Sequence, residues 1–192
     1  MLKSTFGNFV DAESFDSEFL DITISMSSGS IEADWRKNTL CAEFIAKYML
    51  NTISTHRSEH EIEPHDIKDT INYIANEMFE NAVKFTSAIG NRSISFRVSN
   101  DGHTIRFYVR NSIETAHIEP FQILIAELLE GDASEMYFER IEANIENESE
   151  STSGLGYLSI MNDYGADIAW KFEPTEEIDS PDFVTTMIEI NV

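Results

Sequence analysis

The stretch Glu77-Met78-Phe79-Glu80-Asn81-Ala82-Val83-Lys84-Phe85 (EMFENAVKF) ends the clearest helical pattern of the chain. Pro64 and Asp66 before it are typical of a helix start, and Gly90 after it is typical of a helix end. Between them the apolar residues keep three- and four-residue spacing. They are Ile67, Ile71, Ile74, Met78, Ala82 and Phe85. The pattern predicts an amphipathic helix from residue 64 to about residue 87.

A second stripe of this helix is polar. Glu77, Asn81 and Lys84 follow at i, i+4 and i+7, so their side chains share one face. A carboxylate can accept a proton, an amide oxygen can bind magnesium beside phosphate oxygens, and a lysine can bind phosphate. The trio therefore suits triphosphate chemistry, although the same spacing alone also fits a solvated helix edge.

The charge of the chain narrows its partners. The 192 residues include 35 Asp and Glu but only 13 Lys and Arg, which gives a net charge of -22. Such a chain repels nucleic acid and anionic lipid, so we expect neither as a partner. The acidity serves either solubility or the docking of a basic patch on another protein. The length fits a single domain, residues 1–192.

The cellular location is also expected from the sequence. Cys41 is the single cysteine, so no disulfide forms within the chain, and a reducing compartment is expected. The N-terminal residues show no basic region followed by an apolar run, as a signal peptide would. The sequence also contains no run of about 18 uncharged apolar residues. We expect a cytoplasmic protein without a membrane span. Residues 40–46 around Cys41 are interpreted as a buried helix face.

Alternation and helical spacing predict the other elements. Strands are expected at 19–26, 93–98, 104–110, 167–172 and 183–190, with an Asp101-Gly102 hairpin turn after the second. Helices are expected at 33–53, 121–129, 135–145 and 157–163. The helix at 33–53 is indicated by the three- to five-residue spacing of the apolar residues Leu40, Phe44, Tyr48 and Met49. Residues 112–153 carry eleven carboxylates and only Arg140 as a cation, and 146–153 (ENESESTS) are expected to be mobile.

Two motifs in order resemble those of the GHKL superfamily of ATP-binding domains. EMFENAVKF resembles its N box, and Ser153-Gly154-Leu155-Gly156-Tyr157 resembles its second glycine box about seventy residues later. The resemblance covers roughly residues 30–192. It implies a two-layer α/β sandwich with a mixed sheet, helices on one face and an acidic lid at about 112–153.

The resemblance also implies roles for single residues. Glu77 matches the general base, Asn81 the magnesium ligand and Lys84 a phosphate contact. Gly154 and Gly156 match the lid hinge, where a backbone without Cβ can approach phosphates at a helix N-terminus. Thr186, or Thr185 beside it, stands where family members place a threonine near adenine, although strand threonines are also common fillers. The implied cofactors are ATP or ADP with Mg.

One position departs from the family pattern. The adenine-reading Asp of the first glycine box is replaced by Asn111, and both glycines of that box are absent from residues 111–115. Asn can still accept a hydrogen bond through its carbonyl, but it lacks the charge of Asp. The sequence therefore supports two functions.

The first function is that of the stand-alone anti-sigma-factor serine kinases and SiaB-type kinases, which the chain resembles most. It implies a partner-switching regulator that binds Mg-ATP and phosphorylates Ser or Thr of a STAS-domain partner, or sequesters that partner. The sequence does not decide between a homodimer and a monomer. The second function is a non-catalytic interaction module or nucleotide sensor with a degenerate adenine pocket.

Overall fold

The computed structural model describes residues 5–12, 18–25, 31–56, 64–87, 93–147, 154–175 and 181–192. The strands are β1 (Thr5–Phe6), β2 (Glu18–Ser25), β3 (Ser93–Asn100), β4 (Thr104–Ile113), β5 (Asp167–Glu173) and β6 (Asp182–Asn191). The helices are α1 (Ile31–His56), α2 (Pro64–Phe85), α3 (Thr115–Glu130), α4 (Ala133–Asn147) and α5 (Leu155–Tyr164). Residues 146–153 were expected to be mobile, and of these, residues 148–153 lie outside the residues that the structure describes.

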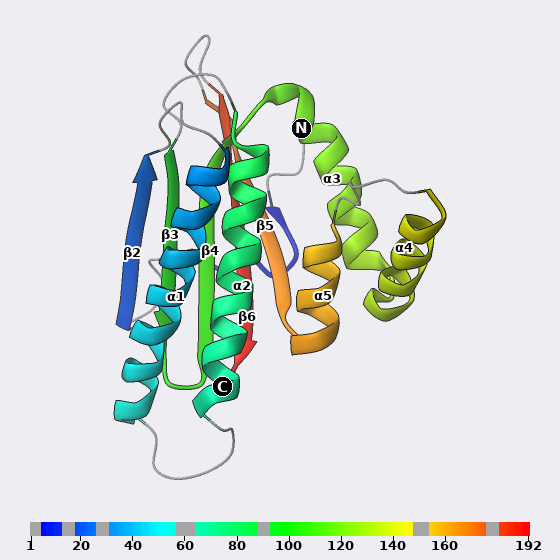
Figure 1. Ribbon diagram of the computed structural model, residues 1–192. Helices are drawn as coiled ribbons and strands as arrows, with labels where there is room; N and C mark the ends of the chain where they lie inside the picture. The colour runs from blue at the N-terminus through cyan, green and yellow to red at the C-terminus, as the bar shows by residue number, and fades with distance from the viewer. Residues whose placement is uncertain are drawn as a thin grey trace.

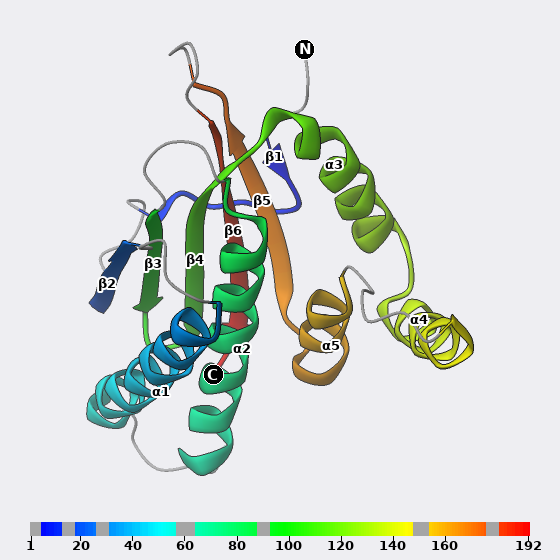
Figure 2. The same ribbon diagram turned by 45° about the horizontal axis from the view of Figure 1, so that its top comes forward.

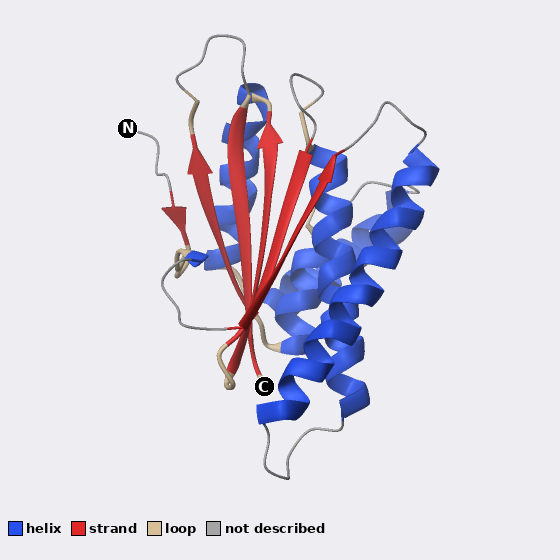
Figure 3. Ribbon diagram, turned by 90° about the vertical axis from the view of Figure 1, so that its left-hand side faces the viewer, coloured by secondary structure: helices blue, strands red, loops and turns tan. Residues whose placement is uncertain are grey.

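The strands form one open six-stranded sheet in the order β1-β5-β6-β4-β3-β2. The helices cover one of its faces, so the protein is a two-layer α/β structure, as expected (Figures 1 and 3). The apolar core lies between the layers and includes the fully buried Phe79, Phe96, Phe107 and Trp170.

The expectation of a mixed sheet is wrong for the strand pairs that the structure describes. Each of the five pairs is antiparallel. The reason is the connections: α1 and α2 form a pair of helices between β2 and β3, so the chain returns to the end where β2 finished (Figure 1). A single crossover helix would have given a parallel pair.

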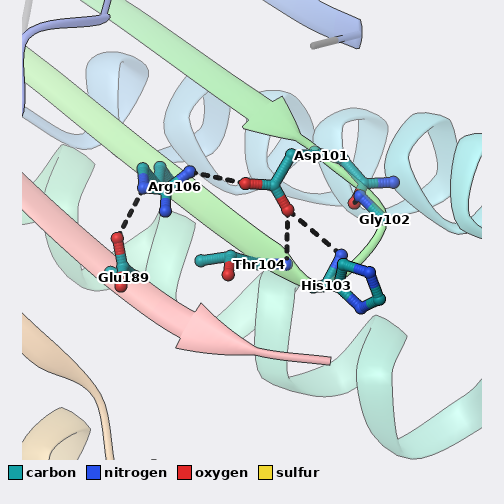
Figure 4. Close-up of polar contacts among 7 residues, drawn as sticks. Asp101, Gly102, His103, Thr104, Arg106 and Glu189 are labelled. Carbon is teal, nitrogen blue, oxygen red and sulfur yellow. Dashed lines mark hydrogen bonds and ion pairs between the residues drawn. The ribbon is translucent and has the colours of Figure 1, made fainter. Parts of the chain in front are cut away.

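The β3–β4 hairpin follows the Asp-Gly signal. Gly102 has φ of 93°, a left-handed conformation that favours glycine. One oxygen of the Asp101 carboxylate accepts the backbone N–H of His103 at 3.1 Å and of Thr104 at 2.9 Å, and the other accepts Nη1 of Arg106 at 2.8 Å (Figure 4). The turn is therefore held by its own side chain, and it sets the register of β3 against β4.

Helix α1 presents a different face to the core than expected. Leu40, Phe44 and Tyr48 are exposed by 68%, 53% and 37%, whereas Ala42, Ile45, Ala46 and Met49 are fully buried. Of the residues used to assign the helix, Met49 alone faces inward, and Cys41 is half-buried. The small side chains of Ala42 and Ala46 let α1 pack closely against α2, so the side of α1 that carries them is buried.

Two helices of the lid segment are longer than expected. Helix α3 begins at Thr115 and includes Pro120 in its second turn, so this proline does not mark the start of the helix. Helix α4 extends the predicted 135–145 by two residues at each end. Within the described residues, no helix has the length and apolar character needed to cross a membrane.

Candidate functional site

The polar stripe of α2 faces the start of α5, as Figure 2 shows for the two helices. Gly156 lies so close to Glu77 that a Cβ at position 156 would overlap Oε2 of Glu77 and would lie 3.2 Å from its Cδ. The same Cβ would lie 3.8 Å from Nδ2 of Asn81. Three of the sequence-predicted residues are therefore brought together.

Polar contacts between the same two helices support this geometry. One turn before Glu77, the Tyr73 hydroxyl donates to Oγ of Ser159 at 2.9 Å, and Ser159 donates to Oδ2 of Asp163 at 2.8 Å. The ring of Tyr73 also packs on that of Tyr164, with centroids 5.4 Å apart. These contacts fix α5 against α2 and so hold Gly156 beside the carboxylate.

Glu77 has a perturbed titration. Burial, and secondarily the charge of Glu80, raise the pKa of Glu77 above its ordinary value of 4.5. A carboxylate with a raised pKa is a stronger base once ionised, which suits proton abstraction from a hydroxyl. The raised pKa is compatible with the predicted role of Glu77 as a general base.

Gly154 begins α5 in the left-handed conformation, with φ of 91°, and its carbonyl accepts the N–H of Leu158 at 3.1 Å. The guanidinium of Arg140 on α4 packs against it so closely that a Cβ at position 154 would overlap Nη1. Arg140 is also 3.7 Å from a carboxylate oxygen of Glu127 on α3. Arg140 thus lies against Gly154 at the start of α5, a contact that the sequence analysis did not predict.

The adenine end of the predicted site lies between the sheet and α2. Asn81, Asn111 and Thr186 line one small pocket there, together with Tyr157 and Phe121. Asn111 is 4% exposed, and its Nδ2 donates to the backbone carbonyl of its neighbour Ser112 at 3.0 Å. The NH₂ group of Asn111 thus donates a hydrogen bond to the backbone of the next residue.

Aromatic rings close this pocket. Its free volume is about 20 Å³, close to the space of one water molecule. Phe121 of α3 stacks on Phe85 at 6.4 Å between centroids and meets Trp170 and Phe172 edge-on at 6.4 and 6.0 Å. A purine base does not fit while Phe121 occupies this position. No sequence pattern predicted that Phe121 closes the pocket, because its ring contacts join segments far apart in the chain.

Two predicted residues lie apart from the pocket. Lys84 is exposed one turn beyond Asn81, with Nζ 5.2 Å from the centroid of the Phe85 ring. Thr185 faces the opposite side of the sheet from Thr186, where it pairs with Arg110 and Lys171 across the strands. Of the two threonines, Thr186 is the one that lines the pocket.

The donors present fit one end of a nucleotide. The oxygens of the Asn81 amide and of the Glu77 carboxylate beside Gly156 can bind magnesium, and the NH₂ group of Asn81 can donate to phosphate. Among the residues described, no three His, Cys, Asp or Glu side chains group into a metal site by themselves. The small pocket lined by Asn111 and Thr186 does not admit a purine base in this conformation.

Comparisons with known proteins leave these residues as the basis for assigning a function. No protein-family model matches the chain, and no curated protein is significantly similar to it.

Proposed function

We propose that this protein is a GHKL-type, ATP-dependent partner-switching regulator that phosphorylates Ser or Thr of a STAS-domain partner or sequesters that partner. The observation that carries the proposal is the contact of Gly156 with Glu77 and Asn81. This contact supports the proposal because a backbone without a Cβ can approach phosphate closely, while the neighbouring carboxylate and amide oxygens can bind magnesium.

In this proposal each residue has a defined task. Asn81 would hold magnesium, Gly154 and Gly156 would let the backbone approach the phosphates, and Glu77 would take the proton of the partner hydroxyl. Bound Mg-ATP would supply the transferable phosphoryl group. Since phosphoryl transfer depends mostly on positioning and charge neutralisation, small displacements of these groups reduce the rate strongly.

The lid is the surface that we assign to the STAS-type partner. Ile123 and Leu129 on α3 and Phe138 on α4 are exposed by 57%, 39% and 60%. Exposed carboxylates lie on the same two helices, among them Glu130 on α3 and Glu139 on α4. Exposed apolar side chains on helices that also carry carboxylates fit a partner that presents apolar side chains together with basic ones.

The stripe of Leu40, Phe44 and Tyr48 on α1, here called the α1 stripe, supports a homodimer. The rings of Phe44 and Tyr48 contact each other at 6.4 Å between centroids. A stripe along one helix is self-complementary when two copies pack antiparallel about a two-fold axis. Glu43 and Lys47, which form an ion pair beside it at 2.6 Å, could exchange partners between the copies.

A second candidate function is a non-catalytic interaction module or nucleotide sensor. The small pocket closed by Phe121 and the Asn111 side chain bonded to Ser112 favour it. In that case the same fold would bind protein partners without turnover, and nucleotide would bind weakly or not at all.

A nucleotide titration separates the two candidates. In a thermal-shift assay with Mg-ADP, a ligand at a hundred times its Kd adds about 2.7 kcal/mol of stability. For a chain of this size that is a rise in Tm of roughly 5–10 °C. Asn81→Ala should abolish the shift. Its matched control is Asn76→Ala, which changes an amide on α2 that donates to the Asn72 carbonyl of its own helix.

The result with millimolar Mg-ADP decides between the candidates. A shift that Asn81→Ala removes and Asn76→Ala keeps supports the kinase. No shift for the unchanged protein contradicts ATP binding in this conformation and favours the interaction module. Transfer of phosphate from labelled ATP to a STAS-domain protein then tests turnover.

A further inference from the structure

The face of the sheet opposite the helices carries a recess of its own. Its volume is about 780 Å³, within the range of roughly 300–1,000 Å³ typical of small-molecule sites. The floor comes from outward side chains of β2 to β6, and the N-terminal residues Phe9, Asp11 and Ala12 form one wall. We call this hollow the open-face recess.

Strand pairing explains why polar groups gather there. One row across the sheet is Thr23, Ser95, Arg110, Thr185 and Lys171, each opposite the next on the neighbouring strand. The adjacent row begins Asp21, Arg97, Tyr108 and ends on Met187 and Ala169. Because side chains alternate between the faces of a strand, both rows point away from the helices.

The recess is less acidic than the chain as a whole. Three of the 13 basic side chains of the protein line it: Arg97, Arg110 and Lys171. Each has an acidic partner, at 2.6 Å for Asp21, 3.1 Å for Glu173 and 2.6 Å for Asp11. The recess is therefore locally neutral, whereas the whole chain carries -22.

Two of the three cations lie deeper than their acidic partners, and Arg110 and Glu173 are about equally exposed. Side-chain exposure is 29% for Arg97 against 48% for Asp21, and 32% for Lys171 against 66% for Asp11. Exposed ion pairs of this kind contribute only about 0–1 kcal/mol, so an incoming anion can replace a rim carboxylate at little cost. The guanidinium of Arg110 is also held flat, 3.8 Å from the centroid of Phe183.

Tyr108 gives the second, independent sign of a ligand. Its side chain is 5% exposed in the centre of the floor, and its hydroxyl has no hydrogen-bond partner among the residues described. A buried hydroxyl without a partner costs about 1–3 kcal/mol, so such groups are usually satisfied by water or ligand. Burial raises the pKa of Tyr108, which keeps the hydroxyl protonated and able to donate at neutral pH.

Apolar groups complete the recess. Phe9 meets Tyr108 edge-on with centroids 6.3 Å apart, and Phe9, Val10 and Ala12 pack on a small cluster of Tyr108, Ala169 and Met187. The N-terminal segment is thus fixed over the sheet as a wall with an aromatic side. A ring can rest against this wall while its charged group reaches the guanidinium groups.

We propose that the open-face recess binds a small aromatic anion, with its carboxylate or phosphate on Arg97 and Arg110 and its ring beside Phe9 and Tyr108. This site is separate from the candidate nucleotide site, which lies on the helix side of the same sheet. Thr185 and Thr186 mark the division, because they are consecutive on β6 and face the two sites in turn.

The test is a titration of the isotope-labelled full chain, followed by NMR, with benzoate, phenyl phosphate and the uncharged benzyl alcohol. The anions should shift amides of β3 and β4 saturably below about 20 mM, and benzyl alcohol should not. Arg97→Gln and Arg110→Gln should each weaken binding at least about fivefold, because each removes a charged hydrogen bond. The charge control is Lys47→Gln, which lies on α1 outside the recess.

Tyr108→Phe gives a readout that a structural role would not give. It should weaken the anions about threefold or more while leaving the free protein as stable as before or more stable, since an unsatisfied hydroxyl is removed. The proposal is overturned if neither anion gives a saturable shift, if the Arg97 and Arg110 variants bind like Lys47→Gln, or if benzyl alcohol binds equally well. Asn81→Ala should leave the shifts unchanged, so failure here is distinct from failure at the nucleotide site.

Discussion

Gly156 touches the side chain of Glu77, and a methyl group at position 156 would overlap the carboxylate. Gly156→Ala should therefore displace Glu77 and weaken Mg-ADP binding about tenfold or more, since precise positioning decides affinity at a phosphate site. The fold should tolerate the change, because Ala is favoured over Gly in a helix by up to about 1 kcal/mol and the obstructing atoms end a flexible side chain. Calorimetric titration and urea unfolding measure the two effects.

A double-mutant cycle isolates that contact. Gly156→Ala should cost less stability, or gain some, in a Glu77→Ala background than in the unchanged protein, with a coupling of about 0.5–3 kcal/mol for side chains in contact. Equal effects of Gly156→Ala in both backgrounds would contradict the packing of Gly156 on Glu77.

The raised pKa of Glu77 predicts a pH dependence. A carboxyl group whose pKa is higher in the folded state binds its proton more tightly there, so its contribution to stability is complete below its unfolded pKa, near 4.5. The contribution is lost as the pH rises through the folded pKa. Glu77→Gln should thus gain stability relative to the unchanged protein as the pH rises from about 4.5 toward 7.

Urea unfolding of both proteins between pH 4 and 8 measures this difference. Glu80→Gln should narrow the window, because the charge of Glu80 contributes to the shift. A constant difference between Glu77→Gln and the unchanged protein over the whole range would contradict a raised pKa.

Local signals in the sequence were sufficient for several elements. Helix α2 follows its apolar spacing, and the β3–β4 hairpin follows Asp101 and Gly102, whose side chain and backbone form the turn without help from distant residues. Strands β5 and β6 are also confirmed within one or two residues at each end. These features depend on neighbours in the chain, which a sequence pattern records.

Features that depend on distant segments were missed or wrong. Helix α1 has apolar residues on two sides, and periodicity cannot decide whether the Leu40–Phe44 side or the Ala42–Ile45 side packs inward. Strand direction depended on the number of connecting helices. The plug formed by Phe121 and the approach of Arg140 to Gly154 join segments that no local pattern relates.

Phe121 should control access to the adenine end of the site. Phe121→Ala removes the ring that closes the 20 Å³ pocket and should raise Mg-ADP affinity about tenfold, at a cost of about 2–4 kcal/mol of stability for a large apolar side chain. Ile123→Ala is the control on the same helix, because Ile123 is 57% exposed. Unchanged or lower affinity for Phe121→Ala, measured by calorimetry, would contradict an occluding role.

The α1 stripe should mediate self-association that strengthens with salt. Two copies of charge -22 repel each other at low ionic strength, and added salt screens that repulsion without weakening apolar contact. Sedimentation at about 50 and 500 mM NaCl should show more dimer at the higher salt. Phe44→Glu should abolish it.

Phe138→Glu is the matched control for the α1 stripe, since Phe138 is similarly exposed, at 60% against 53% for Phe44, but lies on α4. It should leave the dimer intact and instead weaken the STAS-type partner. If Phe138→Glu abolished self-association and Phe44→Glu did not, the two surfaces would have to be exchanged. A monomer at both salt concentrations would contradict the homodimer.

Arg140 should support phosphate binding from the lid. Its guanidinium lies against Gly154 at the start of α5, where the triphosphate is proposed to bind, and it balances part of the surrounding negative charge. Arg140→Gln should weaken Mg-ATP about tenfold and Mg-ADP less, because the added phosphate gains most from a nearby cation. Arg140→Lys should restore only part of the difference, since lysine lacks the planar fork. Equal losses for ATP and ADP in calorimetric titrations would assign Arg140 to holding α4 in place rather than to the phosphates.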